Sequence, residues 1–121
     1  MTPENANVYL VEDNESLRES TKALLELDGH NVVAEAATLD EALEGISKAR
    51  DAGVQVAVVD GNLSQNDLSG NDGNTVADAL RKAIPGIKII SYSSDEQDYG
   101  DVHVSKDVRR GVSISEVITK L

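Results

Sequence analysis

The 121-residue chain contains no cysteine, tryptophan or phenylalanine, and its aromatic residues are limited to three tyrosines. The lack of cysteine excludes disulfides, thiolate metal sites and thiol catalysis. Hydrophobic residues nevertheless make up 40% of the chain. Valine, isoleucine, leucine and alanine must therefore fill the core, and few side chains are left that could stack on a flavin.

The chain also lacks long hydrophobic runs, and its N-terminal segment MTPENAN is not a basic, hydrophobic signal region. We therefore expect a cytoplasmic protein with no membrane attachment. Basic residues are a minority, because 22 acidic against 11 basic residues give a formal net charge of −11. This charge argues against direct binding to nucleic acid, whose phosphates it would repel. The length predicts a single domain over residues 1–121.

Short runs of strand-forming residues alternate along the chain with segments of helical spacing. The β-type runs are residues 7–11, 31–36, 54–59, 87–90 and 102–104. This alternation predicts a parallel sheet with helices on both faces. The polar stretch 61–74 is expected to form one long loop.

Apolar residues at helical spacing predict four helices. The expected buried faces are Leu17, Thr21, Leu24 and Leu25 in the first helix, Ala42, Leu43 and Ile46 in the second, Val76, Leu80, Ala83 and Ile84 in the third, and Ile114, Val117, Ile118 and Leu121 in the last. Capping boxes mark two helix starts, Thr38 with Glu41 and Ser113 with Glu116. Pro85-Gly86 is expected to end the third helix.

Acidic residues stand at the ends of two predicted strands. Glu12 and Asp13 follow the first, and Asp60 follows the third. Ligands of an open parallel sheet bind at the carboxyl ends of its strands, where the strand order reverses. If these two strands are neighbours, three carboxylates meet there, and each raises the pKa of the others. Mg²⁺ would relieve the repulsion, with the backbone carbonyl of Asn62 as a further oxygen ligand.

Two more polar groups are expected at the same edge. The fourth strand delivers the Ser93 hydroxyl, with Ser91 and Ser94 as alternatives, and the fifth strand delivers Lys106. A nucleophilic carboxylate, a metal ion, a hydroxyl and a lysine are the groups needed to accept a phosphoryl group. The metal and the lysine neutralise the phosphoryl oxygens, and the hydroxyl donates a hydrogen bond to one of them.

From VYLVEDNESLRES to the last predicted helix, the sequence resembles receiver domains of two-component response regulators. The resemblance implies a flavodoxin-like α/β sandwich whose five-stranded parallel sheet has the order 2-1-3-4-5. It implies that Asp60 is phosphorylated by a sensor histidine kinase or a histidine phosphotransfer protein. Glu12 and Asp13 match the acidic pair that holds Mg²⁺, Ser93 matches the switch hydroxyl, and Lys106 matches the lysine that contacts the phosphate.

Such a domain is a signalling module and not an enzyme, apart from its own phosphotransfer and dephosphorylation. It acts on an output protein that the sequence does not name, and its oligomeric state is equally open. His103 stands at the switch position, where the family usually carries tyrosine or phenylalanine, and a histidine there could couple activation to pH. The alternative for this position is an ordinary surface histidine.

Three features depart from the family pattern. The loop after Asp60 is several residues longer than usual. Only eight residues, 94–101, separate the fourth and fifth strands. This is too short for a crossover helix with its loops, so the family's fourth helix is expected to be missing or reduced to one turn. Lys106 is followed by Asp107 where the family usually has proline, and we expect a trans peptide bond there.

Two other interpretations stay open. The first is a pseudo-receiver, which uses the same fold as a phosphorylation-independent protein-interaction module. The second is a flavodoxin-like enzyme that binds a nucleotide or a flavin. The second is disfavoured because EDNES follows the first strand, where a glycine-rich phosphate loop would be needed.

Overall fold

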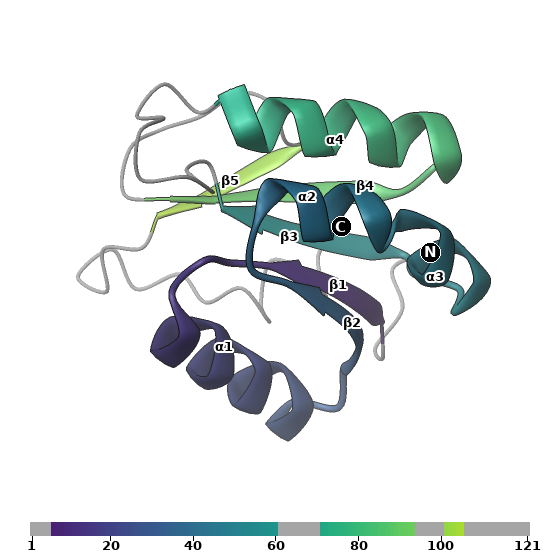
Figure 1. Ribbon diagram of the computed structural model, residues 1–121. Coiled ribbons are helices and arrows are strands. Elements are labelled where there is room, and N and C mark those ends of the chain that lie inside the picture. The colour runs from purple at the N-terminus through teal and green to yellow at the C-terminus, as the bar shows by residue number, and fades with distance from the viewer. Residues whose placement is uncertain (1–5, 61–70, 94–100, 106–121) are drawn as a thin grey trace.

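The computed structural model shows a five-stranded parallel sheet with helices on both faces (Figure 1). It describes residues 6–60, 71–93 and 101–105. The elements in chain order are β1 (Asn7–Val11), α1 (Glu15–Leu27), β2 (Asn31–Ala36), α2 (Leu39–Glu44), α3 (Ile46–Asp51), β3 (Val56–Asp60), α4 (Asn71–Ala83), β4 (Lys88–Ser93) and β5 (Val102–Ser105). The strand order is β2-β1-β3-β4-β5, which confirms the predicted topology.

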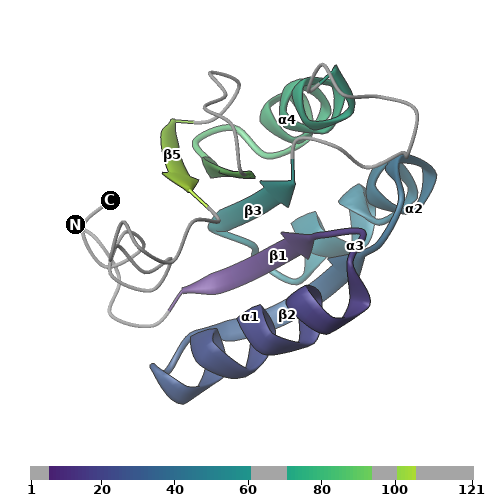
Figure 2. The same ribbon diagram turned by 90° about the vertical axis from the view of Figure 1, so that its left-hand side faces the viewer.

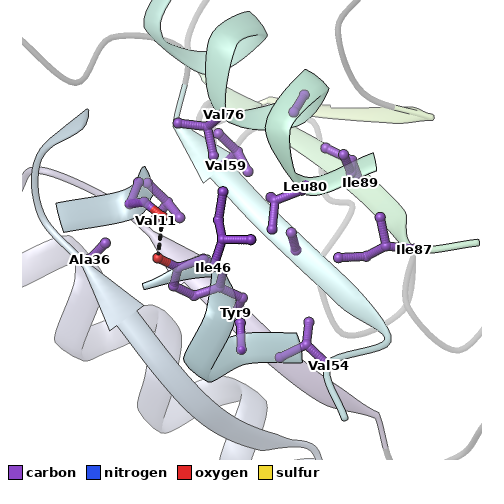
Figure 3. Close-up of a cluster of buried hydrophobic side chains, with 14 residues drawn as sticks. Tyr9, Val11, Ala36, Ile46, Val54, Val59, Val76, Leu80, Ile87 and Ile89 are labelled. Carbon is purple, nitrogen blue, oxygen red and sulfur yellow. Dashed lines mark hydrogen bonds between the residues drawn. The ribbon is translucent and has the colours of Figure 1, made fainter. Parts of the chain in front are cut away.

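Two hydrophobic cores lie on opposite faces of the sheet. Successive side chains of a strand point to opposite faces, so the central strands contribute to both cores. Tyr9 and Val11 of β1 pack on the face covered by α2, α3 and α4 (Figure 3). Val8 and Leu10 pack on the other face with Leu25 of α1. Burial on both faces explains why β1 and β3 are continuous hydrophobic runs.

The bounds of three strands differ from the prediction, those of β5 only by its last residue, Ser105. β3 begins at Val56, because the N–H of Val54 donates to the carbonyl of Ala49 and so belongs to the end of α3 (3.1 Å). β4 continues beyond Ile90 to Ser93 and pairs with β3 and β5 along this extension. The apolar run stops at Ile90, but the continuation agrees with the prediction that this strand delivers Ser93.

Positive-φ glycines lie between a helix and the next strand at three places, Gly29, Gly53 and Gly86. Gly29 follows α1 with φ 93°, and Gly86 follows α4 with φ 87°. Side chains with a Cβ rarely adopt this conformation, whereas glycine adopts it at little cost. The predicted stop at Pro85-Gly86 is thus confirmed.

The beginning of α4 corrects the prediction of a loop over 61–74. The helix begins at Asn71, so residues 71–74 form its first turn. Short polar residues are well accepted there, because the first N–H groups of a helix have no intrahelical partner. This turn carries no apolar residue that could mark it as helical in the sequence.

Two residues assigned to buried helix faces are exposed. Leu24 of α1 is 41% exposed and Leu43 of α2 is 38% exposed. Each stands beside a residue that is fully buried, Leu25 and Ala42 respectively. Neighbouring helix residues point about 100° apart, so only one of each pair can face the sheet.

The second predicted helix is divided at Gly45 into α2 and α3. The buried hydroxyl of Tyr9 donates a 2.8 Å hydrogen bond to the carbonyl of Ala42, as Figure 3 shows. A Cβ atom on Gly45 would lie 2.5 Å from that hydroxyl oxygen. Tyr9 therefore occupies the space that a larger residue at the break would need. The capping box at the start of α2 is confirmed, since the N–H of Glu41 donates to Thr38 Oγ1 (3.1 Å).

Asp101 anchors the beginning of β5 to β4. The N–H of Asp101 donates to the carbonyl of Ile89 (2.7 Å), and the N–H of Ile89 donates to the carboxylate of Asp101 (2.8 Å). Arg81 of α4 lies 3.9 Å from the other carboxylate oxygen of Asp101. Eight residues, 94–101, link β4 to β5. The prediction about the fourth family helix falls mostly on residues 94–100, which lie outside the described residues, as do the last predicted helix and the Lys106-Asp107 bond.

Gly45→Ala should destabilise the protein by about 1–3 kcal/mol, because the new methyl group overlaps the Tyr9 hydroxyl. In a Tyr9→Phe background the ring atom nearest to the new Cβ atom would be Cζ, at 3.4 Å, which is an ordinary contact distance. There the substitution should cost about 1 kcal/mol less, since the overlap with the hydroxyl oxygen is absent. Urea unfolding of the four proteins of this double-mutant cycle measures the coupling. Equal costs in the two backgrounds would show that Tyr9 does not cause the break.

Stability should fall between about pH 10 and pH 12 because of Tyr9. Burial, and to a lesser degree the charge of Glu41, raises the pKa of Tyr9 from 10.0 to about 12. In this pH range the unfolded chain loses the phenolic proton and the folded protein keeps it, so unfolding becomes more favourable as pH rises. Unfolding free energies measured along this range should decline more steeply in the wild type than in Tyr9→Phe. Parallel declines would contradict the assignment.

Candidate functional site

The carboxyl ends of the central strands bring the predicted site residues to one edge of the sheet. Val11 of β1 lies opposite Val59 of β3, so Glu12 and Asp60 are the next residues on neighbouring strands. The arrowheads of β1 and β3 point to the same edge in Figure 2. Asp60 in turn lies opposite Tyr92 of β4. The predicted meeting of Glu12 and Asp60 at this edge therefore follows from the strand register.

The register also places the fourth and fifth strands at this edge. Ser93, the last residue of β4, lies opposite Ser105, the last residue of β5. Lys106 is the next residue along the chain but lies outside the described residues, as do Asn62 and Ser94. His103 lies inside β5, opposite Ser91.

Glu12 is a buried carboxylate at the end of an apolar strand. Only 1% of the residue is exposed, and its N–H donates to the carbonyl of Ala36 (3.0 Å). Asp13, the next residue, is exposed. A buried carboxylate needs compensating groups, and a buried acidic residue at a strand end is a candidate for a functional role.

The helix that follows the acidic pair begins immediately. Asn14 caps α1, because its side-chain oxygen accepts a hydrogen bond from the N–H of Leu17 (3.0 Å). Only three residues therefore separate the end of β1 from the first helical residue, Glu15. The N–H groups at the start of α1 present positive partial charge beside Asp13, which favours an anionic side chain there.

The structure adds Arg18, which sequence reasoning missed. Its Nη1 donates to the backbone carbonyl of Glu12 (2.9 Å), and its Nε lies 3.7 Å from Glu35 Oε1. The other oxygen of Glu35 is 3.0 Å from the Lys22 ammonium. No local pattern marks Arg18, because its position between Glu12 and Glu35 depends on the pairing of β1 with β2.

The described side chains contain no group of three acidic, histidine or cysteine residues placed to hold a metal ion. Glu12 and Asp13 are the two predicted ligands whose side chains the structure describes. Both offer carboxylate oxygen, the donor type that Mg²⁺ prefers. The donors present at this edge therefore fit that ion.

Comparison with known proteins identifies the family. The sequence model of the response regulator receiver domain matches residues 8–112. The chain belongs to this family. It is thus a receiver domain, a signalling domain of two-component systems, and the predicted family assignment is confirmed. No curated protein shows significant similarity to the chain.

Solved structures of receiver domains share the fold. A LuxR-family two-component response regulator from Aurantimonas sp. SI85-9A1 is 23% identical with a TM-score of 0.72, over 96% of this chain and 86% of that one. A CheY-like receiver domain from Methanospirillum hungatei JF-1 is 23% identical with a TM-score of 0.70, over 95% and 94% of the two chains. CheY in a CheX–CheY–BeF3–Mg²⁺ complex from Borrelia burgdorferi matches with 16% identity and a TM-score of 0.75, over 98% and 89%.

These similarities confirm the flavodoxin-like α/β fold. Identity is at most 23% among the three, so they establish the architecture and not the chemistry of individual residues. Among the described parts of the chain, no helix is both long and apolar enough to cross a membrane.

Glu12→Gln should raise the free energy of unfolding near neutral pH by about 1 kcal/mol or more. The substitution keeps the shape of a side chain that is 1% exposed and removes its charge from an acidic edge. Asp13→Asn, at an exposed position, should change stability by less than about 0.5 kcal/mol. Urea unfolding of both variants without added metal is the measurement. A loss of stability in Glu12→Gln would show instead that the folded protein compensates the buried charge.

Proposed function

We propose that this receiver domain accepts a phosphoryl group on Asp60 from a phosphohistidine of a sensor histidine kinase or a histidine phosphotransfer protein. The observation that carries the proposal is the β1–β3 register, which sets the buried Glu12 beside the end of β3. A carboxylate kept in a costly environment next to a second acidic strand end is typical of a site that holds a cation for phosphoryl transfer.

The transfer exchanges one bond to phosphorus for another. A carboxylate oxygen of Asp60 attacks the phosphorus atom, the bond from phosphorus to the histidine nitrogen breaks, and the imidazole leaves with the electron pair. Glu12, Asp13, Asp60 and the backbone carbonyl of Asn62 would hold Mg²⁺, which neutralises charge on the phosphoryl oxygens when bound. Lys106 supplies a further positive charge through its ammonium group.

The switch hydroxyl is assigned to Ser93. Ser91 is fully buried within β4, opposite Val59, and so lies one residue before the level of Asp60. Ser93 is the last residue of the strand and lies beyond that level. This placement supports Ser93 over Ser91 as the group that donates a hydrogen bond to the phosphoryl oxygen.

Phosphorylation would bias an equilibrium between two conformations of the domain and so change its affinity for an output protein. In this proposal the domain acts in the cytoplasm. Its reactions are limited to its own phosphorylation and dephosphorylation. His103 is the candidate for the residue that changes position with Ser93, because β5 pairs directly with β4. The net charge of −11 supports a protein partner over nucleic acid or an anionic membrane.

Incubation with acetyl phosphate and Mg²⁺ should add the mass of one phosphoryl group to the intact protein. The adduct should be absent without Mg²⁺ and absent in Asp60→Ala, because the first removes the compensating cation and the second removes the nucleophile. Intact-protein mass spectrometry measures both. Asp78→Ala, which removes an exposed carboxylate of α4, serves as the matched control and should be phosphorylated like the wild type.

Absence of the adduct in the wild type would favour the pseudo-receiver interpretation. Beryllofluoride provides a second test, since it mimics an aspartyl phosphate and the Borrelia burgdorferi CheY was crystallised with BeF3 and Mg²⁺. No change in the amide NMR spectrum with beryllofluoride and Mg²⁺, together with no mass adduct, would overturn the proposed function.

A further inference from the structure

We propose that Arg18 is a positioning residue for the acidic pair Glu12 and Asp13, and that Mg²⁺ affinity depends on it. The inference rests on the proposed function, because it concerns the same metal site. Arg18 is not a metal ligand and does not touch the acceptor. It acts on the backbone that carries the two carboxylates.

The backbone of Glu12 is held at both of its polar groups. Its N–H donates to the carbonyl of Ala36 at the end of β2 (3.0 Å), and its carbonyl accepts from Arg18 Nη1 (2.9 Å). The peptide between Glu12 and Asp13 is planar and trans, so its C=O and N–H point in opposite directions. Fixing the Glu12 carbonyl toward Arg18 therefore also fixes the direction in which Asp13 leaves the strand.

Arg18 is itself held in place. Its side chain is 19% exposed, and its Nε pairs with Glu35 of β2 at 3.7 Å. Lys22, one helical turn further along α1, holds the other Glu35 oxygen at 3.0 Å. The guanidinium thus joins the first turns of α1, the end of β1 and the end of β2. A planar group with several donors is suited to such a branched contact, whereas a lysine ammonium is not.

Charge and position predict opposite effects of removing Arg18, which makes the proposal testable. A cation beside the acidic pair repels Mg²⁺, so removing the charge alone should tighten Mg²⁺ binding. If Arg18 instead holds the ligands in place, its removal should weaken binding. Substitution of residues that orient metal ligands typically lowers metal affinity by about 10- to 100-fold.

The test is Mg²⁺ titration of the full chain by isothermal calorimetry. Arg18→Met, which keeps the apolar stem, should raise the Kd by roughly tenfold. Arg18→Lys, which keeps the charge and loses the branched contact, should also raise the Kd, by about threefold or more.

Two matched controls remove one positive charge each: Lys22→Met within the Glu35 network and Arg50→Met in the exposed Arg50–Asp51 pair of α3. Both should stay within about twofold of the wild type.

Two further measurements separate positioning from loss of structure. Urea unfolding without metal should show that each variant is fully folded under the titration conditions. The amide NMR signal of Asp13 should shift in Arg18→Met before any Mg²⁺ is added, because the Glu12–Asp13 peptide is freed. Arg18→Lys keeps the test valid if Arg18→Met does not fold.

The outcomes distinguish the two proposals. Wild-type protein that binds no Mg²⁺ would overturn both the proposed function and the role of Arg18. Wild-type protein that binds Mg²⁺, with unchanged or tighter binding in Arg18→Met and Arg18→Lys, would overturn the positioning role alone. Weaker binding in both variants with unchanged binding in Lys22→Met and Arg50→Met supports it.

Discussion

The structure depends on the pairing of β1 with β2 on one side and with β3 on the other. The chain leaves β1 for β2 and then crosses back to β3, so the strand order reverses at β1. The segments after β1 and β3 accordingly lead to helices on opposite faces, α1 on one and α4 on the other (Figure 1). Such a reversal opens a crevice at the carboxyl ends of the two strands. The residues that follow Val11 and Val59 stand at that crevice, and both are acidic.

The core supplies the stability that the acidic edge opposes. Residues 8–11 of β1 are fully buried, and they end in the buried carboxylate of Glu12. Tyr9 ties this strand to α2 through the carbonyl of Ala42, and Arg18 ties its end to α1 and β2. Contacts on both sides of β1 keep this carboxylate in its position. The position of Glu12 is therefore maintained by residues on three other elements, α1, α2 and β2.

Features with a local signal were predictable from the sequence, and features that depend on contacts between distant segments were not. Glu12 and Asp60 were found because each interrupts an apolar run at its end. The strand order came from the family resemblance, since apolar periodicity indicates faces of a sheet and not neighbours.

The break at Gly45 depends on Tyr9, which lies 33 residues before its partner Ala42. The role of Arg18 likewise depends on Glu35, which reaches it only through strand pairing. The first turn of α4 was missed because it contains no apolar residue.

Asp101 determines the register in which β5 pairs with β4. Its two hydrogen bonds with Ile89 set where β5 joins the sheet, so Val102 lies opposite Ile90 and Ser105 lies opposite Ser93. Lys106 follows Ser105 directly, and four strand residues therefore carry the chain from this anchor to the edge where β1 and β3 end. A slip of one residue would turn every side chain of β5 to the other face of the sheet. The paired hydrogen bonds between Asp101 and Ile89 thus fix the position at which β5 enters the sheet.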